Sequence, residues 1–269
     1  MTDHHREDPD LFDAIEEFVM NSENIGIDPQ IFHILDNMES SEEEIASIEK
    51  LVDLKLALRL RNMSCSVYYG MHRHGKVRKF NDVITSIGMQ PAKLFIIALT
   101  LFSRLGAGHK MIEVESFAVS LFAKVLAEQM HMNQDTVERA EIGGLFLTLG
   151  KVIIAIYETE KHITVEPAFI EKHHREFAVK LIENLTLPEF LAEVVLENRF
   201  VLRKNSLPVT GIVYLAKALV EKLIGDFGLI EIKSPMPDVV DNLETTIGLK
   251  IMEYFNLIGL GQYLRVIRC

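Results

Sequence analysis

Two adjacent histidines, His173 and His174, are the residues whose type most directly suggests metal chemistry. Neutral imidazole nitrogens bind divalent metals, and two histidines four residues apart on a helix can share one ion. Adjacent residues point about 100° apart on a helix, so these two side chains cannot share an ion in that way. We therefore expect a hydrogen-bonded His174 inside a pocket and an exposed His173. His4 and His5 are expected to belong to a loose terminus.

A basic segment runs from residue 72 to residue 79 in a chain that is otherwise acidic. Its cations could receive an acidic partner protein, or an anionic ligand such as a nucleotide. They are Arg73, Lys76, Arg78 and Lys79. The opposing interpretation is that these side chains are solvated and pair with neighbouring carboxylates, which contributes little to stability.

Patterns typical of nucleophilic or nucleotide-dependent catalysis do not accompany these residues. Gly143, Gly144 and Gly150 lack the strand, turn and helix context of a phosphate-binding loop, so they indicate close helix packing. No Ser, His and Asp combination has the context of a nucleophile elbow. The sequence therefore favours binding over catalysis, and it calls for no cofactor.

The elements that must position these side chains are amphipathic helices. Apolar residues recur at three- and four-residue steps, as in residues 118–130, and no segment alternates convincingly. Residues 41–44 form the pattern of a capping box, and residues 94–102 are apolar on every side, which predicts a central buried helix. Further helix starts are marked by Pro91, Pro188 and Pro208. We expect an all-α fold.

Breaks in this pattern divide the chain. A polar, glycine-containing break at residues 103–110 predicts a joint between two helical subdomains, and a proline-rich break at 234–237 precedes a tail. The expected divisions are a polar N-terminal extension (1–24), a first subdomain (25–105), a second subdomain (106–233) and a C-terminal helical tail (234–269). The tail must either cover its own domain or join a second copy of the chain, because it carries an apolar stripe, Leu243, Ile247, Ile251 and Phe255.

Charge and composition narrow the function classes. The 269-residue chain has 28 Lys and Arg against 39 Asp and Glu, a net charge of −11, which opposes general nucleic-acid binding. Cys65 and Cys269 lie far apart, as in a protein of a reducing compartment. The longest apolar runs, residues 94–102 and 145–157, are shorter than the roughly 20 residues needed to span a bilayer. With an acidic start in place of a secretory signal, we expect a cytoplasmic protein without a membrane segment.

Several short motifs follow one another with a spacing typical of one family. They are Leu-Arg-x-x-Asn at 58–62, Tyr-Tyr-Gly at 68–70, Val-Ile-x-x-Ile-Gly at 83–88 and Gly-Leu-Phe-Leu-Thr-Leu-Gly-Lys at 144–151. Together with residues 171–174, 187–188 and 213–219, they resemble the HD-related output domain, HDOD, over about residues 25–225. The resemblance implies a signalling domain related to HD phosphohydrolases, with a multi-helical HD-domain-like bundle preceded by an N-terminal helical subdomain.

The resemblance also implies that the metal site of HD enzymes is degenerate in this chain. Those enzymes hold divalent metals with histidines and aspartates, and the metal activates a water for attack on a phosphoryl group. Their paired His-Asp corresponds to Leu147 and Thr148, and their late aspartate corresponds to Lys217. Their first histidine falls near Glu115 and Ser116.

Of the implied ligand positions, only His174 keeps a side chain that binds metals. An ammonium at position 217 would repel a dication, so the resemblance implies that no metal is bound. We expect Lys217 to pair instead with Glu141 or another nearby carboxylate.

The leading hypothesis is a non-catalytic signalling adaptor that binds an unidentified protein partner. A homo-oligomer of the chain is compatible with this hypothesis. The first alternative is a metal-dependent phosphohydrolase whose site is rebuilt from His174 with Glu141 or Glu171. The second alternative is a binder of anionic ligands or nucleotides that uses residues 72–79, which the net charge disfavours.

Overall fold

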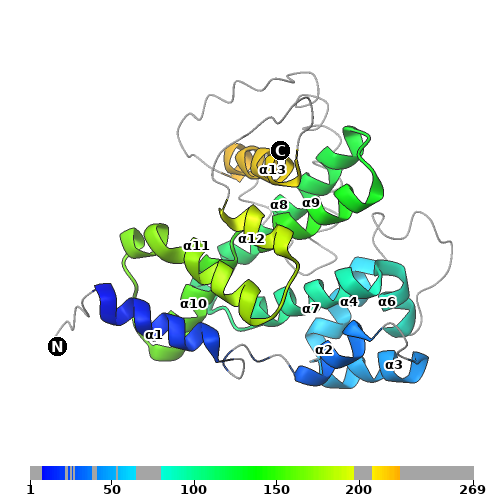
Figure 1. Ribbon diagram of the computed structural model, residues 1–269, viewed down its shortest axis with the longest axis horizontal. Coiled ribbons are helices and arrows are strands. Elements are labelled where there is room, and N and C mark those ends of the chain that lie inside the picture. The colour runs from blue at the N-terminus through cyan, green and yellow to red at the C-terminus, as the bar shows by residue number, and fades with distance from the viewer. Residues whose placement is uncertain are drawn as a thin grey trace.

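The computed structural model describes residues 8–21, 24, 26, 28–37, 41–52, 54–64, 80–196 and 208–224. Regular structure in these residues is entirely helical, which confirms the predicted fold class (Figure 1). The predictions for the basic segment 72–79, the tail 234–269, the two cysteines and the N-terminal histidines concern residues outside these ranges.

The first group of helices comprises α2 (Pro29–Asp36), α3 (Glu42–Leu51), α4 (Leu54–Ser64), α6 (Phe80–Ile87) and α7 (Met89–Ser103). The capping box predicted at the start of α3 is present. The Ser41 hydroxyl accepts from the Glu44 N–H at 3.2 Å, and the Glu44 carboxylate accepts from the Ser41 N–H at 2.7 Å. Every residue of α7 from Ala92 through Leu99 is buried, so α7 is the central helix that its apolar sequence predicts.

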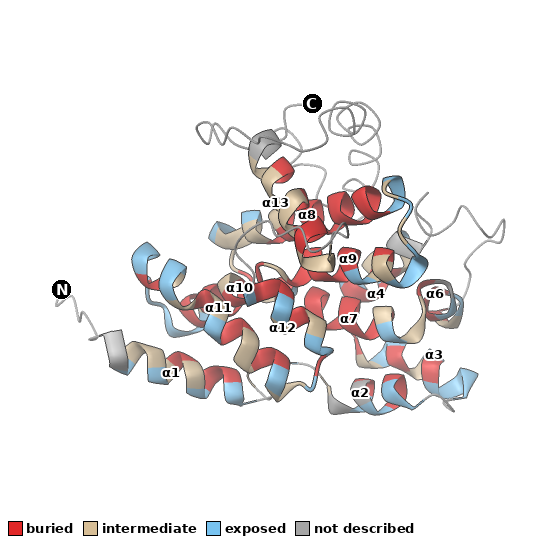
Figure 2. Cartoon of the chain, turned by 45° about the horizontal axis from the view of Figure 1, so that its top comes forward, coloured by how far each residue is buried: buried red, intermediate tan, exposed pale blue. Residues whose placement is uncertain are grey.

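The second group comprises α8 (Lys110–Gln129), α9 (Gln134–Phe146), α10 (Leu149–Lys161), α11 (Pro167–Asn184), α12 (Glu189–Leu196) and α13 (Val209–Ile224), and a short 3-10 turn η2 (Ala107–His109) precedes it. α8 packs along α9 and α13, and α10 packs along α11. The run Gln134–Lys161 is long and apolar enough to cross a membrane, but 89% of its most apolar window is buried inside the protein, as expected for core helices (Figure 2).

The helix nearest the N-terminus, α1 (Asp8–Met20), lies against α11 of the second group and away from α2 and α3 (Figure 1). Its residues Ile15, Phe18 and Val19 are buried. An ion pair of 2.6 Å joins Glu16 to Lys180 of α11. The structure therefore gives a packing role to part of the stretch that the sequence presents as a polar extension.

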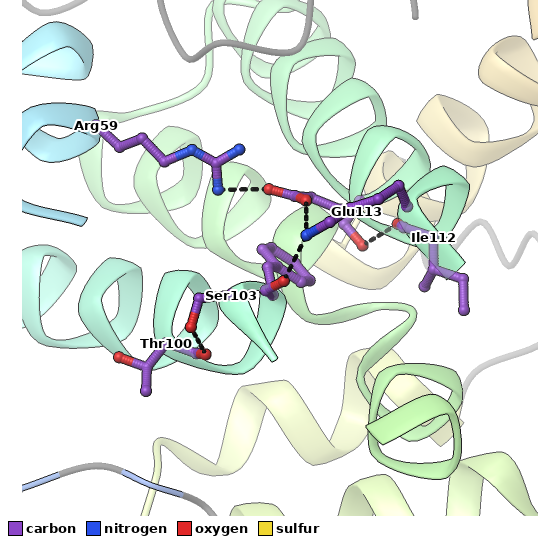
Figure 3. Close-up of polar contacts among 8 residues, drawn as sticks. Arg59, Thr100, Ser103, Ile112 and Glu113 are labelled. Carbon is purple, nitrogen blue, oxygen red and sulfur yellow. Dashed lines mark hydrogen bonds and ion pairs between the residues drawn. The ribbon is translucent and has the colours of Figure 1, made fainter. Parts of the chain in front are cut away.

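The two groups meet at a fully buried carboxylate, that of Glu113 on α8 (Figure 3). Arg59 of α4 approaches one carboxylate oxygen to 2.5 Å, and the Lys110 ammonium lies 3.2 Å from the other. Lys110 also donates to the carbonyl of Phe102, at the end of α7, at 3.0 Å. Arg59 belongs to the Leu-Arg-x-x-Asn motif, so the arginine of this motif joins the first group of helices to the second through its ion pair with Glu113.

Candidate functional site

Two close helix crossings form the frame of the site. A Cβ added to Gly144 on α9 would lie 2.7 Å from the Cα of Ser120 on α8. A Cβ added to Gly150 on α10 would overlap the backbone carbonyl of His174 on α11. Both glycines therefore serve close helix packing, as the sequence indicates, and the second one sets the distance between α10 and the histidine.

A pocket of about 220 Å³ opens where α8, α10, α11, α12 and α13 converge near the start of α10. Charged and polar side chains make up most of its lining. These are Glu115, Thr148, Lys151, His174, Arg175, Tyr214, Lys217 and Glu221, and the apolar lining residues are Leu147, Val195 and Ala218. The lining comes from positions more than a hundred residues apart in the sequence, so only the folded chain brings it together.

The positions that the family resemblance assigns to the HD metal site come together in this pocket. Leu147, Thr148, His174 and Lys217 all line it, and so does Glu115. Ser116 lies behind the lining and is fully buried. The folded chain therefore brings these assigned positions together, although they come from four separate segments of the sequence.

Thr148 is oriented toward the protein interior by a short chain of hydroxyl groups. Its Oγ1 is hydrogen-bonded to Ser116 Oγ, and Ser116 Oγ donates to the carbonyl of Ile112 at 2.8 Å. Because the Ser116 proton is used on that carbonyl, Thr148 must be the donor to Ser116. The threonine hydroxyl proton is thus not available to a ligand in the pocket.

The two lysines of the pocket make ion pairs at its edge. The Lys217 ammonium lies 3.5 Å from Glu221, one turn further along α13. The Lys151 ammonium donates to Glu171 of α11 at 2.6 Å. The hydrogen bond from Lys151 and its positive charge hold the pKa of the Glu171 carboxyl below its usual range. Lys217 thus pairs with a nearby carboxylate, as expected, but that carboxylate is not Glu141.

Glu141 lies in the contact between α9 and α8, where its carboxylate is 3.1 Å from the ammonium of Lys124. Both side chains are buried. Glu141 does not line the pocket and Glu171 pairs with Lys151, so the two carboxylates are not gathered around His174 as the rebuilt metal site would require. The described residues contain no group of three or more His, Cys, Asp or Glu side chains arranged to hold a metal ion.

His174 has the environment expected for it, since it is buried and its Nδ1 lies 2.9 Å from the carbonyl of Ile170. A carbonyl only accepts, so Nδ1 carries the hydrogen and Nε2 keeps its lone pair. Burial lowers the pKa of His174, and the positive charge of Lys151 lowers it further. The imidazole is therefore held in its neutral form.

His173 differs from its prediction, because its side chain is only 16% exposed. Its ring packs against Phe12 of α1 and Phe169 of α11, with centroid distances of 5.1 and 4.7 Å. The prediction of an exposed His173 is wrong because α1 covers this face of α11. His173 has a packing role and takes no part in the pocket.

Glu115 is the carboxyl group set deepest among the charges of the pocket. Burial raises its pKa above the usual range, while the ammonium groups of Lys217 and Lys151 act in the opposite direction. This carboxyl group therefore lies within electrostatic reach of both lysines.

Sequence reasoning gave no role in this site to Lys151, Arg175, Tyr214 or Glu221, all of which line the pocket. A signal for three of them was present. Lys151 is the last residue of the Gly-x-x-x-x-x-Gly-Lys motif at 144–151, Tyr214 lies in the stretch 213–219 that carries the resemblance, and Glu221 follows Lys217 by one helical turn. Nothing in the residue pattern points to Arg175.

The arrangement of helices is that of HD-like proteins, as solved structures show. A proposed metal-dependent phosphohydrolase from Shewanella amazonensis SB2B superposes with a TM-score of 0.58 at 13% identity, covering 95% of this chain and 99% of its own. A second proposed phosphohydrolase from the same organism gives 0.55 at 15% identity, with 93% and 98% covered. An HDOD domain protein of unknown function from Geobacter sulfurreducens gives 0.57 at 15% identity, with 89% and 97% covered. At these identities the likeness concerns the fold.

The family is shown by sequence. The model of the HDOD domain matches residues 27–199, which is more than half of the chain. This chain therefore belongs to the HDOD family, as its motifs suggested. No curated protein matches it significantly.

Proposed function

We propose that this chain is a non-catalytic interaction module that binds a protein partner in the cytoplasm and relays a regulatory input to it. The observation that carries the proposal is the ammonium of Lys217 in the pocket, at the position that the family resemblance assigns to an aspartate of HD enzymes. Catalytic metals need donors that can approach a dication, and a lysine ammonium repels one.

The neighbouring positions support the same conclusion. Leu147 has no donor atom, and the hydroxyl of Thr148 is engaged with Ser116. Of the assigned positions only His174 keeps a metal-binding side chain, and the carboxyl groups of Glu115 and Glu221 in the same pocket face ammonium groups. Catalytic divalent sites use three or more protein ligands or a bound phosphate besides. The side chains of this pocket do not fit the metal of HD enzymes, so we assign no hydrolytic step to it.

The direct test is elemental analysis of the purified protein after gel filtration, together with assays on phosphoesters and cyclic nucleotides in added manganese. We expect no stoichiometric metal and no hydrolysis. About one metal per chain, with an activity that is lost in His174→Ala, would overturn the proposal.

The partner is sought by affinity capture from the native cytoplasm, and the basic segment is the first surface to test on it. Changing Arg73, Lys76, Arg78 and Lys79 together to Ser should weaken the association. If the segment is a docking surface, the thermal midpoint should stay unchanged, because charges at a surface contribute little to folding. The association should also weaken as salt rises, since charges are screened over about 8–10 Å at physiological salt. An unchanged affinity in the quadruple variant would exclude this segment as the docking surface.

A further inference from the structure

Cationic groups converge on the pocket from three different helices. Lys151 comes from α10, Arg175 from α11 and Lys217 from α13, and all three line the same cavity of about 220 Å³. Like charges at close quarters repel one another in a site of reduced dielectric. Their convergence is therefore stabilised by whatever negative charge the pocket holds.

The two carboxylates that pair with these lysines are partly exposed to solvent. Glu171 pairs with Lys151 but leaves 64% of its side chain exposed, and Glu221 pairs with Lys217 at 3.5 Å with 36% of its side chain exposed. Ion pairs of this kind contribute only about 0–1 kcal/mol, because water competes for both charges. An anion that entered the pocket could replace either carboxylate without breaking a strong contact.

The remaining polar groups of the pocket are also compatible with an anion. The neutral imidazole of His174 presents Nε2, which can accept from a protonated acid group or take up a proton beside an anion. Glu115 also lines the pocket, and its burial disfavours its charged form. Tyr214 adds a phenol hydroxyl to the lining.

We propose that this pocket binds a small free anion, a carboxylate or a phosphate group, through the ammonium groups of Lys151 and Lys217. The inference rests on the proposed function, because it takes the pocket to be free of metal and gives it a ligand of the opposite charge. A ligand held from α10 and α13 at once ties together helices that are not adjacent in sequence. Its binding stabilises their arrangement by mass action and supplies the input that the module relays.

The test uses the full chain and two minimal probes, inorganic phosphate and acetate, at constant ionic strength set with sodium chloride. Binding is followed by the thermal midpoint and by NMR shifts of the backbone amides around Lys151 and Lys217. We expect saturable shifts confined to the pocket with at least one probe. Phosphate and acetate then distinguish the two acid groups, and methylammonium, which carries the opposite charge, should give no shift.

Substitutions locate the site. Lys217→Met and Lys151→Met should each weaken binding by about tenfold or more, as expected when one charge-assisted contact is lost. Lys161→Met is the matched control, since Lys161 is an exposed lysine at the opposite end of α10. No saturable shift with either probe, or equal affinity in all three variants, would overturn the proposal. Two variants at different helices keep the test decisive if one of them folds poorly.

The test of anion binding and the test of the proposed function can fail independently of each other. Failure of both probes to bind would leave the expected absence of metal and hydrolysis unaffected. Conversely, a bound metal with phosphoester hydrolysis would refute the proposed function, while the lysine variants would still decide whether the ammonium groups hold the anion.

Discussion

Two lysine–glutamate pairs in one set of packed helices have different surroundings. Lys124 of α8 and Glu141 of α9 approach to 3.1 Å, with 7% and 8% of their side chains exposed. Lys217 and Glu221 of α13 stand 3.5 Å apart, with 31% and 36% exposed. α13 packs on both α8 and α9, so the two pairs belong to helices in direct contact.

This difference in burial distinguishes charges that the folded state needs for stability from charges that it does not need. In the buried pair neither charge can turn to water, so each one depends on groups inside the protein, the other member of the pair among them. In the pocket pair both side chains reach solvent, and the geometry is that of an ordinary pair within one helix. The first pair is a fixed part of the core, whereas the ammonium groups of the pocket remain available to a ligand.

The largest expected effect is that of Lys124→Met. It removes the ammonium 3.1 Å from the buried Glu141 carboxylate, which should lower the free energy of unfolding by about 3–5 kcal/mol. Equilibrium unfolding in urea, read by circular dichroism, measures the loss. The double variant Lys124→Met/Glu141→Met should recover most of it, because two apolar side chains of similar volume need no counter-charge.

The matched control for that experiment is Arg139→Met, which removes an exposed pair between Arg139 and Asp135 one helical turn apart on α9. The Arg139 guanidinium also lies 5.7 Å from the centroid of the Phe190 ring, so the expected cost is at most about 1 kcal/mol. If Lys124→Met cost no more than Arg139→Met, burial would not distinguish the two kinds of pair and the comparison would fail.

The next effect concerns the frame of the pocket. Gly150→Ala places a methyl group on the backbone carbonyl of His174, so α10 and α11 must move apart. We expect a loss of about 1–3 kcal/mol or more, as for other overpacked sites, together with altered NMR shifts around the pocket. Gly108→Ala is the control, since nothing lies within 4 Å of a Cβ there. Equal stabilities for the two variants would show that α10 and α11 are not held at close approach.

Much of the fold was predictable from local patterns. Apolar residues at three- and four-residue steps identify α8, and an unbroken apolar run identifies α7, because a helix with such a sequence must be buried. The same periodicity was present in α1, where Ile15 and Val19 are one turn apart. In α1 the periodicity predicts a packed helix less clearly, because the surrounding residues are acidic. That helix nevertheless determines the burial of His173.

The site was predictable in position but not in its contacts. Motif order placed Leu147, Thr148, His174 and Lys217 in one region, since the backbone of a family persists when ligands are replaced. The pair of Lys217 with Glu221 was readable from their spacing on one helix, but the expected pair with Glu141 depended on how α13 crosses α9, and periodicity carries no such information. Arg175 was missed for the same reason, because only the tertiary structure turns it toward the pocket.

A smaller effect is the pH dependence introduced by Glu115. Burial raises its pKa above the ordinary value of 4.5, so the folded state holds a proton that the unfolded state releases. The contribution of this group to stability is therefore present at low pH and declines as pH rises through the folded pKa. Glu115→Gln should melt higher than the parent at neutral pH, and the difference should vanish below about pH 4.5.

Glu171 gives the opposite sign and serves as the internal control. The hydrogen bond from Lys151 lowers its pKa, so its contribution is present above the ordinary value and declines as pH falls through the folded pKa. Glu171→Gln should therefore melt lower than the parent at neutral pH and approach it in acid. The difference in melting temperature between variant and parent should thus change with pH in opposite directions for Glu115→Gln and Glu171→Gln. A change in the same direction for both variants would contradict this account of the pocket.

The smallest expected effect is that of Lys217→Met on stability. Pairs one turn apart on a helix contribute about 0.3–0.5 kcal/mol, and lysine placed before glutamate is the weaker of the two orders. Removing the ammonium also withdraws a positive charge that favours ionisation of Glu115, which adds a little to the loss at neutral pH. Urea unfolding should therefore give a change of about 0.5 kcal/mol, close to that of Arg139→Met. A loss as large as that of Lys124→Met would mean that Lys217 is a structural charge that fills a vacated metal site. A small one means that the folded chain holds an ammonium group in its pocket without needing it to fold, as a residue that binds a ligand would be.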